Sequence, residues 1–193
     1  MRRKRGDVER GIAVAKFEQY LKSHNLEYVK SIDNGAVLIT MAFPAPKCPG
    51  KWVEGCVWFY KECMEARTYY SETGANFCRK SEHRDELFRL LNFLNARVFL
   101  YATDGFGNRI YNPHLLYNPR IYMTEDDCFD ITITTTIPYD FYELAPLETA
   151  DYLTMFCVEL LKDLSAPIFF LLLGEWSVDQ SISYVERAVL KEG

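Results

Sequence analysis

The stretch that decides the fold is residues 81–101, SEHRDELFRLLNFLNARVFLY. Its first part predicts an amphipathic helix, because leucines recur at the spacing of helical turns: Leu87, Leu90, Leu91 and Leu94. We expect Ser81 to cap this helix, since a serine hydroxyl can accept a hydrogen bond from the first turn. The segment Arg97-Val98-Phe99-Leu100-Tyr101 then has the composition of a strand. The helix is therefore expected to pass into a strand with almost no linker.

The residues before this stretch predict one helix and the first strand. Apolar residues at helical spacing indicate an amphipathic helix over residues 7–24. Asp33-Asn34-Gly35 predicts a turn. The apolar run from Val37 to Phe43 predicts a strand with both faces largely covered.

Further strand signals lie on both sides of the central helix. Aromatic and β-branched residues indicate strands at 56–60 and 63–71. We expect Lys61-Glu62 to form the turn between them, and a single bent strand is the alternative. Beyond the helix, Gly105-Phe106-Gly107 lacks the third glycine of a phosphate loop and precedes a strand, so it predicts a hairpin turn.

The clearest strand is Phe129 to Ile137, where apolar and polar residues alternate. One face carries the apolar set, Phe129, Ile131, Ile133 and Ile137. The other face carries the polar set, Asp130, Thr132, Thr134 and Thr136. This polar face is expected to be solvated, or else to be covered by a second subunit or a peptide strand.

The last third of the chain predicts helices. Pro146 suits a first helical position, and an apolar stripe follows it: Ala150, Leu153, Cys157, Leu160, Leu161 and Leu164. Ser165 and Pro167 are expected to restart or kink this helix before Gly174 ends it. Ser177-Val178-Asp179-Gln180 has the form of a capping box and opens a final helix.

This order predicts an α+β fold in which an antiparallel sheet carries its helices on one face. We expect residues 1–193 to form a single domain, because no internal repeat or change of composition divides the chain. Residues 1–6 contain Arg2, Arg3, Lys4 and Arg5 and are expected to form a basic, frayed N-terminus.

Composition and charge exclude several classes of function. The chain of 193 residues has a net charge of −5, and residues 121–163 hold ten acidic residues against one basic residue. Such a surface repels phosphate backbones, so we expect no nucleic-acid partner. No apolar run approaches the roughly 20 residues that span a membrane, and no secretory signal follows the basic tip. We therefore expect a soluble cytoplasmic protein with reduced cysteines.

The central helix ends in the run Leu90-Leu91-Asn92-Phe93-Leu94-Asn95, and the expected strand and glycine-containing hairpin follow it directly. This arrangement resembles the YbjN-type family. That family of sensory-transduction regulators shares the fold of type III secretion chaperones, and the resemblance covers roughly residues 12–173. It implies a helix, a three-strand block, a helix, a further strand block and a closing helix. It also implies a chaperone-like protein that binds other proteins, with no catalytic residues and no cofactor. The helix from Val178 to Lys191 is an addition to the family's pattern.

Two groups of side chains are candidates for binding sites. Asn92 and Asn95 lie on neighbouring positions of one helical face, where they can bind a ligand or, as we expect, hold the helix-to-strand junction. A zinc site would need the cluster Cys48, Cys56, Cys63, Cys78 and His83. The spacing contains no Cys-x2-Cys pair, so no metal is expected.

The remaining polar groups suggest weaker candidates. Glu125, Asp126, Asp127 and Asp130 lack the spacing of a calcium-binding loop and are expected to form a solvated turn. His24 suits the C-terminal end of the first helix. His114 is expected to lie in a loop, with a pocket as the alternative.

Together these patterns favour a non-catalytic protein-interaction or regulatory domain with an unidentified protein partner. We expect a homodimer that uses an exposed sheet face or the C-terminal helices. The alternative is an enzyme or a small-ligand-binding protein whose pocket gathers scattered residues: Arg120, Asp130, His114 and Tyr139.

Overall fold

The computed structural model describes residues 2–99, 101–103, 106, 108–111, 113–124 and 128–191. Its strands are β1 (Tyr28–Asp33), β2 (Ala36–Pro44), β3 (Trp52–Phe59), β4 (Cys63–Tyr70), β5 (Tyr101–Thr103), β6 (Arg109–Tyr111), β7 (Arg120–Met123) and β8 (Ile131–Pro138). Its α-helices are α1 (Arg2–Ser23), α2 (Glu72–Lys80), α3 (Arg84–Arg97), α4 (Tyr139–Leu144), α5 (Pro146–Asp151), α6 (Cys157–Leu172) and α7 (Val178–Ala188). Short turns of other helix types are η1 (Pro49–Lys51), η2 (Pro113–Tyr117) and the π-helix η3 (Tyr152–Phe156).

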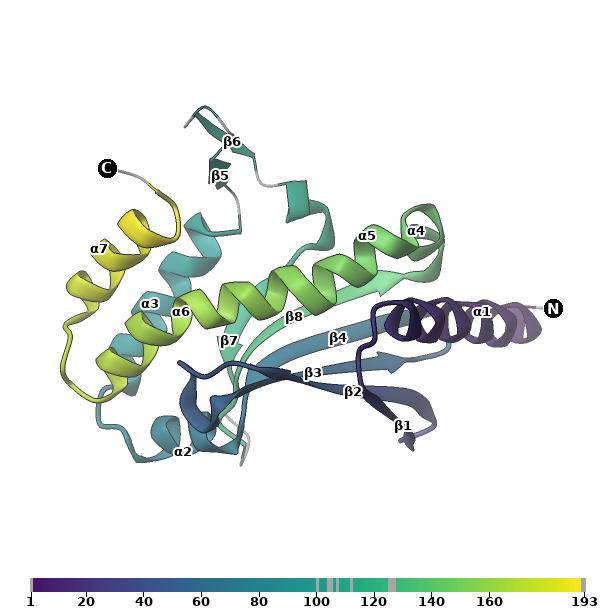
Figure 1. The fold of residues 1–193 in the computed structure, drawn as a ribbon, viewed down its shortest axis with the longest axis horizontal. Coiled ribbons are helices and arrows are strands. Elements are labelled where there is room, and N and C mark those ends of the chain that lie inside the picture. The colour runs from purple at the N-terminus through teal and green to yellow at the C-terminus, as the bar shows by residue number, and fades with distance from the viewer. Residues whose placement is uncertain are drawn as a thin grey trace.

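The strands form an antiparallel sheet with the helices beside it, which confirms the predicted α+β class. Within the described residues, six strands pair in the order β1-β2-β3-β4-β8-β7, and β5 and β6 form a separate hairpin. Figure 1 shows α1, α5 and α6 lying across the sheet, with α3 and α7 packed at one end. Lys61-Glu62 turns the chain between β3 and β4, as the sequence predicts.

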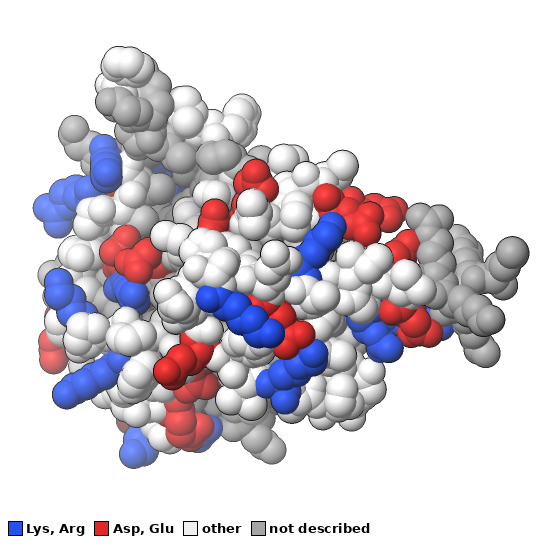
Figure 2. Space-filling view, turned by 45° about the vertical axis from the view of Figure 1, so that its right-hand side comes forward, with Lys and Arg blue, Asp and Glu red and all other residues white. Residues whose placement is uncertain are grey.

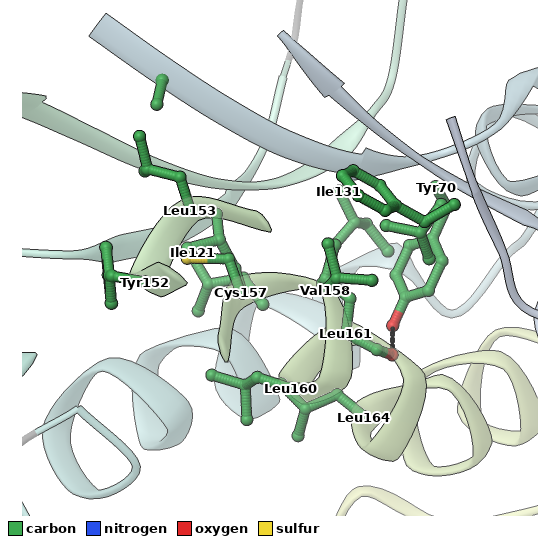
Figure 3. Packing of buried hydrophobic residues seen from close by; sticks show 14 of the residues in the cluster. Tyr70, Ile121, Ile131, Tyr152, Leu153, Cys157, Val158, Leu160, Leu161 and Leu164 are labelled. Atoms are coloured by element: carbon green, nitrogen blue, oxygen red, sulfur yellow. Dashed lines mark hydrogen bonds between the residues drawn. The ribbon is translucent and has the colours of Figure 1, made fainter. Parts of the chain in front are cut away.

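One face of the sheet is buried under the helices. In β4, Met64, Ala66 and Tyr70 are buried while the alternate residues Glu65 and Arg67 stay partly exposed. The predicted stripe of α5 and α6 packs on this face, and Figure 3 shows Cys157, Val158 and Leu161 of α6 turned toward the strands. The Tyr70 hydroxyl donates a hydrogen bond to the carbonyl of Leu161 and so ties β4 to α6. Because this layer is continuous, the described part of the chain has a single apolar core.

The alternation predicted for residues 129–137 is confirmed in β8, with two corrections. Ile131, Ile133 and Ile137 face the core. Phe129 precedes the strand and has a positive φ of 58°. Thr132, on the face expected to be solvated, is only 1% exposed. The expectation of two covered faces for residues 37–43 is wrong, because Ala42 on the second face is exposed.

The side chain of Asn95 closes one edge of the sheet. Its amide nitrogen donates to the Ile121 carbonyl over 2.8 Å, and its amide oxygen accepts the Ile121 N–H over 2.9 Å. The same nitrogen also reaches the Leu91 carbonyl of α3 at 3.0 Å. Ile121 lies in β7, whose other edge pairs with β8. The carboxamide therefore takes the place of a neighbouring strand's peptide group and fixes α3 to β7, whereas we expected it to hold the junction with the strand that follows the helix. That strand, expected at residues 97–101, begins only at Tyr101 as β5, because α3 extends to Arg97 and Val98 and Phe99 form a turn.

Several local predictions differ from the structure at element ends. The helix expected from residue 7 begins at Arg2, so Arg2–Gly6, expected to be frayed, are helical, and Gly6 is buried against Lys61. Ser81 does not cap α3, which starts after His83; its hydroxyl donates to the Leu172 carbonyl instead. Gly105 and Gly107 lie outside the described residues.

The C-terminal helices also correct one prediction. α6 continues through Pro167 to Leu172 without a break, and the irregular turn is the π-helix η3 ahead of it. The capping box of α7 is present, with Ser177 and Gln180 bonded reciprocally. The helix ends at Ala188, three residues before the expected Lys191. Gly174 ends the preceding helix with a φ of 73°, as expected.

We predict that Asn95→Ala lowers the free energy of unfolding by about 2–3 kcal/mol, because the buried N–H and C=O of Ile121 lose their partners. Urea denaturation followed by circular dichroism measures this change. Asn92→Ala is the matched control, since Asn92 is exposed on the same helix. Equal stability of the two variants would contradict the role given to Asn95.

Candidate functional site: the open face of the sheet

The face of the sheet turned away from the helices is the main candidate site. Directly paired residues of antiparallel strands share a face, so the register defines three rows of side chains that cross the sheet. The first row is Val29, Thr40, Cys56, Arg67, Thr134 and Arg120. The second row is Ser31, Leu38, Trp58, Glu65 and Thr136, and the third is Ala42, Glu54, Tyr69, Thr132 and Tyr122. We call these three rows, together with Trp52 next to Glu54, the open face.

The large side chains of the open face are separate from the core. Trp58, Tyr69 and Tyr122 are half-buried, yet they belong neither to the core nor to the apolar residues packed against it. Tyr69 and Tyr122 flank Thr132 on the two neighbouring strands, which explains why Thr132 is buried. The aromatic rings and Arg67 thus cover the sheet themselves, in place of a helix.

Polar contacts hold the aromatic residues in fixed positions. The Trp58 indole donates from Nε1 to Asp33 Oδ2 over 2.8 Å. The Arg67 guanidinium lies 5.3 Å from the centre of the Trp58 ring, and its Nε donates to Glu65 over 2.7 Å. Such a cation–π contact favours one rotamer for both side chains. The centre of the open face is therefore an ordered Trp–Arg pair.

A second contact set surrounds Cys56. Its sulfur lies 3.3 Å from the Tyr69 hydroxyl and 3.8 Å from the Thr40 hydroxyl. Burial raises the pKa of the Cys56 thiol, and burial together with the contact to Cys56 raises the pKa of Tyr69. Both groups are therefore protonated near neutral pH, so this set is structural and carries no activated nucleophile.

One end of the open face is hollowed. A depression of about 580 Å³ is lined in part by Val29, Thr40, Ala42 and Trp52. Trp52 is 45% exposed and Val29 is 67% exposed, so two large apolar side chains meet solvent there. Exposed apolar groups that cluster beside a shallow hollow are typical of interaction surfaces.

The cysteines and histidine proposed as a possible zinc cluster do not come together. Cys56 lies on the open face, whereas Cys48 and Cys78 belong to the core on the opposite side of the sheet. His83 instead contacts Glu86. Across the described residues, no group of three or more His, Cys, Asp or Glu side chains has the arrangement of a metal site.

The residues of the alternative pocket are also dispersed. Asp130 and Tyr139 flank the two ends of β8, a strand of eight residues, and their nine positions of separation place them roughly 30 Å apart at about 3.3 Å per residue. His114 lies in η2 and lines one groove, while Tyr139 lines a different one beside Gly6. Arg120 stays exposed on β7. Thus no single pocket gathers this set.

The other candidates have local roles. The His24 ring lies 3.0 Å from the Tyr20 carbonyl at the end of α1, as expected. Asn92 is exposed, and the side-chain amide of Asn95 is hydrogen-bonded to the backbone of Ile121. Of the acidic group, Glu125, Asp126 and Asp127 lie outside the described residues. Acidic and basic groups are interspersed over the surface seen in Figure 2, so no broad basic track appears on that side.

The comparisons with known proteins add no analogy for the open face. No protein-family model, curated protein or solved structure matches the chain. Among the described helices, none has the length and apolar character needed to span a membrane. The chemistry of the open face itself therefore indicates what this surface binds.

We predict that the cysteines differ sharply in reactivity toward Ellman's reagent at mildly alkaline pH. Cys128 is exposed and should react first, whereas burial raises the pKa of Cys78 and of Cys157 to about 12 and keeps both as thiols. Absorbance and mass spectrometry measure the order of labelling. Cys128→Ser should remove the fastest phase; fast labelling of Cys157 in the folded protein would contradict this assignment.

Proposed function

We propose that this protein is a non-catalytic protein-interaction domain that forms a homodimer through the open face. The single observation that carries the proposal is the ordered aromatic and arginine layer, Trp58, Tyr69, Tyr122 and Arg67, on a sheet face without a covering helix in the described chain. Trp, Tyr and Arg are the residues enriched at the energetic centres of protein interfaces.

The fixed geometry of this layer supports binding by a preorganised surface. Asp33 and Glu65 already hold Trp58 and Arg67, so little side-chain freedom is lost when a partner docks. Thr134 and Thr136 of β8 add short hydroxyl side chains between the larger groups. A broad, ordered and partly aromatic surface suits a second folded protein better than a small ligand.

The distribution of charge supports a second copy as the partner. Arg120 and Arg67 lie toward the β7 side of the open face, and Glu54 lies on β3. A two-fold interface brings the same surface of both subunits together. A face with both signs at separate positions can pair with itself in this way.

The resemblance to the YbjN-type family agrees with this proposal, because it implies protein binding without catalysis. The family assignment and the chaperone-like role remain part of the proposal. The dispersal of Arg120, Asp130, His114 and Tyr139 removes the specific pocket on which an enzymatic alternative was based.

We predict that Thr134→Glu converts the dimer into a monomer. Thr134 pairs directly with both Arg67 and Arg120, so a glutamate there is compatible with the folded monomer but places a larger charged group in the middle of the interface. Analytical ultracentrifugation at micromolar concentration should give twice the chain mass for the unchanged protein and one chain mass for the variant.

Thr73→Glu is the matched control, because Thr73 is exposed on α2 and outside the open face. It should leave the dimer intact. A monomeric unchanged protein, or equal masses for the two variants, would refute the proposed dimer.

A further inference from the structure

A second surface feature lies on the helical side of the molecule, beside the π-helix η3. A groove of about 470 Å³ is lined by His114, Glu148, Asp151, Tyr152, Met155, Phe156 and Glu159. This volume falls within the range of small-ligand pockets. Because the groove is on the helices, it is separate from the open face.

The half-buried rings of Phe156 and His114 form the inner wall of the groove, and the buried rings of Tyr152 and Tyr117 pack behind them. Tyr152 stacks on Tyr117 at 4.2 Å between ring centres, and Phe156 lies 5.4 Å from Tyr152 on its other side. The His114 imidazole lies 4.2 Å from the Phe156 ring. Burial lowers the pKa of His114, so the imidazole is neutral near neutral pH and behaves as a further aromatic surface.

The π-helix explains why Phe156 and Met155 reach the surface while Tyr152 stays buried. The Cys157 N–H donates to the Tyr152 carbonyl five residues earlier, in place of the usual four. The widened turn aligns Tyr152 with Cys157 in the core and leaves Phe156 partly exposed and Met155 58% exposed. Single π turns inside helices occur frequently at functional sites.

The rim of the groove is acidic. Asp151 accepts a hydrogen bond from the Tyr20 hydroxyl over 2.6 Å, and Glu159 pairs with Lys162 over 2.8 Å. Within the described chain the carboxylate of Glu148 has no hydrogen-bond or ion-pair partner. The groove therefore has a net negative charge above an aromatic wall.

The Tyr152 hydroxyl lies on the core side of the groove wall, beside the Cys157 thiol. Tyr152 is fully buried, and its hydroxyl has no nitrogen or oxygen partner among the described residues, although it interacts with the weakly polar Cys157 thiol.

We propose that this groove binds an organic cation, an ammonium group attached to an aromatic body. The aromatic wall accepts the apolar part of such a ligand, and a cation near the rings gains from their negative faces. The unpaired carboxylate of Glu148, with Asp151, supplies the countercharge. A free arylalkyl amine and a lysine side chain next to an aromatic residue share this chemistry.

Calorimetric titration of the full-length protein with phenethylammonium tests the proposal. The matched neutral probe is 2-phenylethanol, which has the same ring and chain with a hydroxyl in place of the ammonium group. A second arm uses the blocked dipeptide acetyl-phenylalanyl-lysine amide; the tighter of the two cationic probes identifies the source. We expect at least one cationic probe to bind and 2-phenylethanol to bind at least fivefold more weakly.

Two exposed positions give variants that leave the fold unchanged. Glu148→Gln should weaken the binding of the cationic probe about fivefold, because it removes one countercharge. Met155→Lys should abolish binding, because the new ammonium group occupies the groove, while Met155→Leu should retain it. Glu143→Gln, an exposed carboxylate outside the groove, is the charge control and should have no effect. Equal affinity for phenethylammonium and 2-phenylethanol, or no binding of either cationic probe, would overturn the proposal.

Discussion

The sheet buries one face under helices and leaves the other to its own side chains, and most of the structure depends on this asymmetry. The stripe of α5 and α6 supplies apolar side chains for one side only, so β2, β3, β4, β7 and β8 alternate between a core residue and a residue of the open face. Asn95 completes this arrangement because it holds α3 against the β7 edge and so ends the sheet there. The open face exists because the described helices pack on the opposite face of the sheet.

The sequence predicted the elements whose signal is local. The alternation of Ile131 to Ile137 identifies both β8 and its core face, and Ser177 with Gln180 marks the start of α7. Residues 28–33 were not predicted as a strand, because β1 is an edge strand whose apolar residues Val29 and Ile32 point to opposite faces and stay exposed. Helix α2 was missed as well.

The prediction at Pro167 failed for a tertiary reason. A proline inside a helix costs roughly 3 kcal/mol, yet Leu164, Ile168 and Leu171 on either side of it are all buried. Their burial outweighs the loss of one hydrogen bond, and α6 continues. The π-helix has no comparable local signal, so the sequence offered a pocket at His114 only as an alternative and did not indicate which residues line it.

The open face was only partly predictable, because it is assembled by register between distant strands. The threonine row of β8 was recognised, but its neighbours Arg67 and Tyr69 come from β4, more than 60 positions earlier in the chain. The alternation of Glu65, Arg67 and Tyr69 with buried residues was available as a signal of the same face. Which strand lies beside which follows from long-range pairing, and local periodicity does not contain it.

Hydroxyl-radical footprinting at low and high protein concentration tests the role of the open face most directly. The account predicts that Trp58 and Tyr122 lose labelling as the concentration rises, while Tyr111, 72% exposed on the separate β5–β6 hairpin, keeps its labelling. Unchanged labelling of Trp58 and Tyr122 at a concentration where the protein is dimeric would place the interface elsewhere and contradict the account.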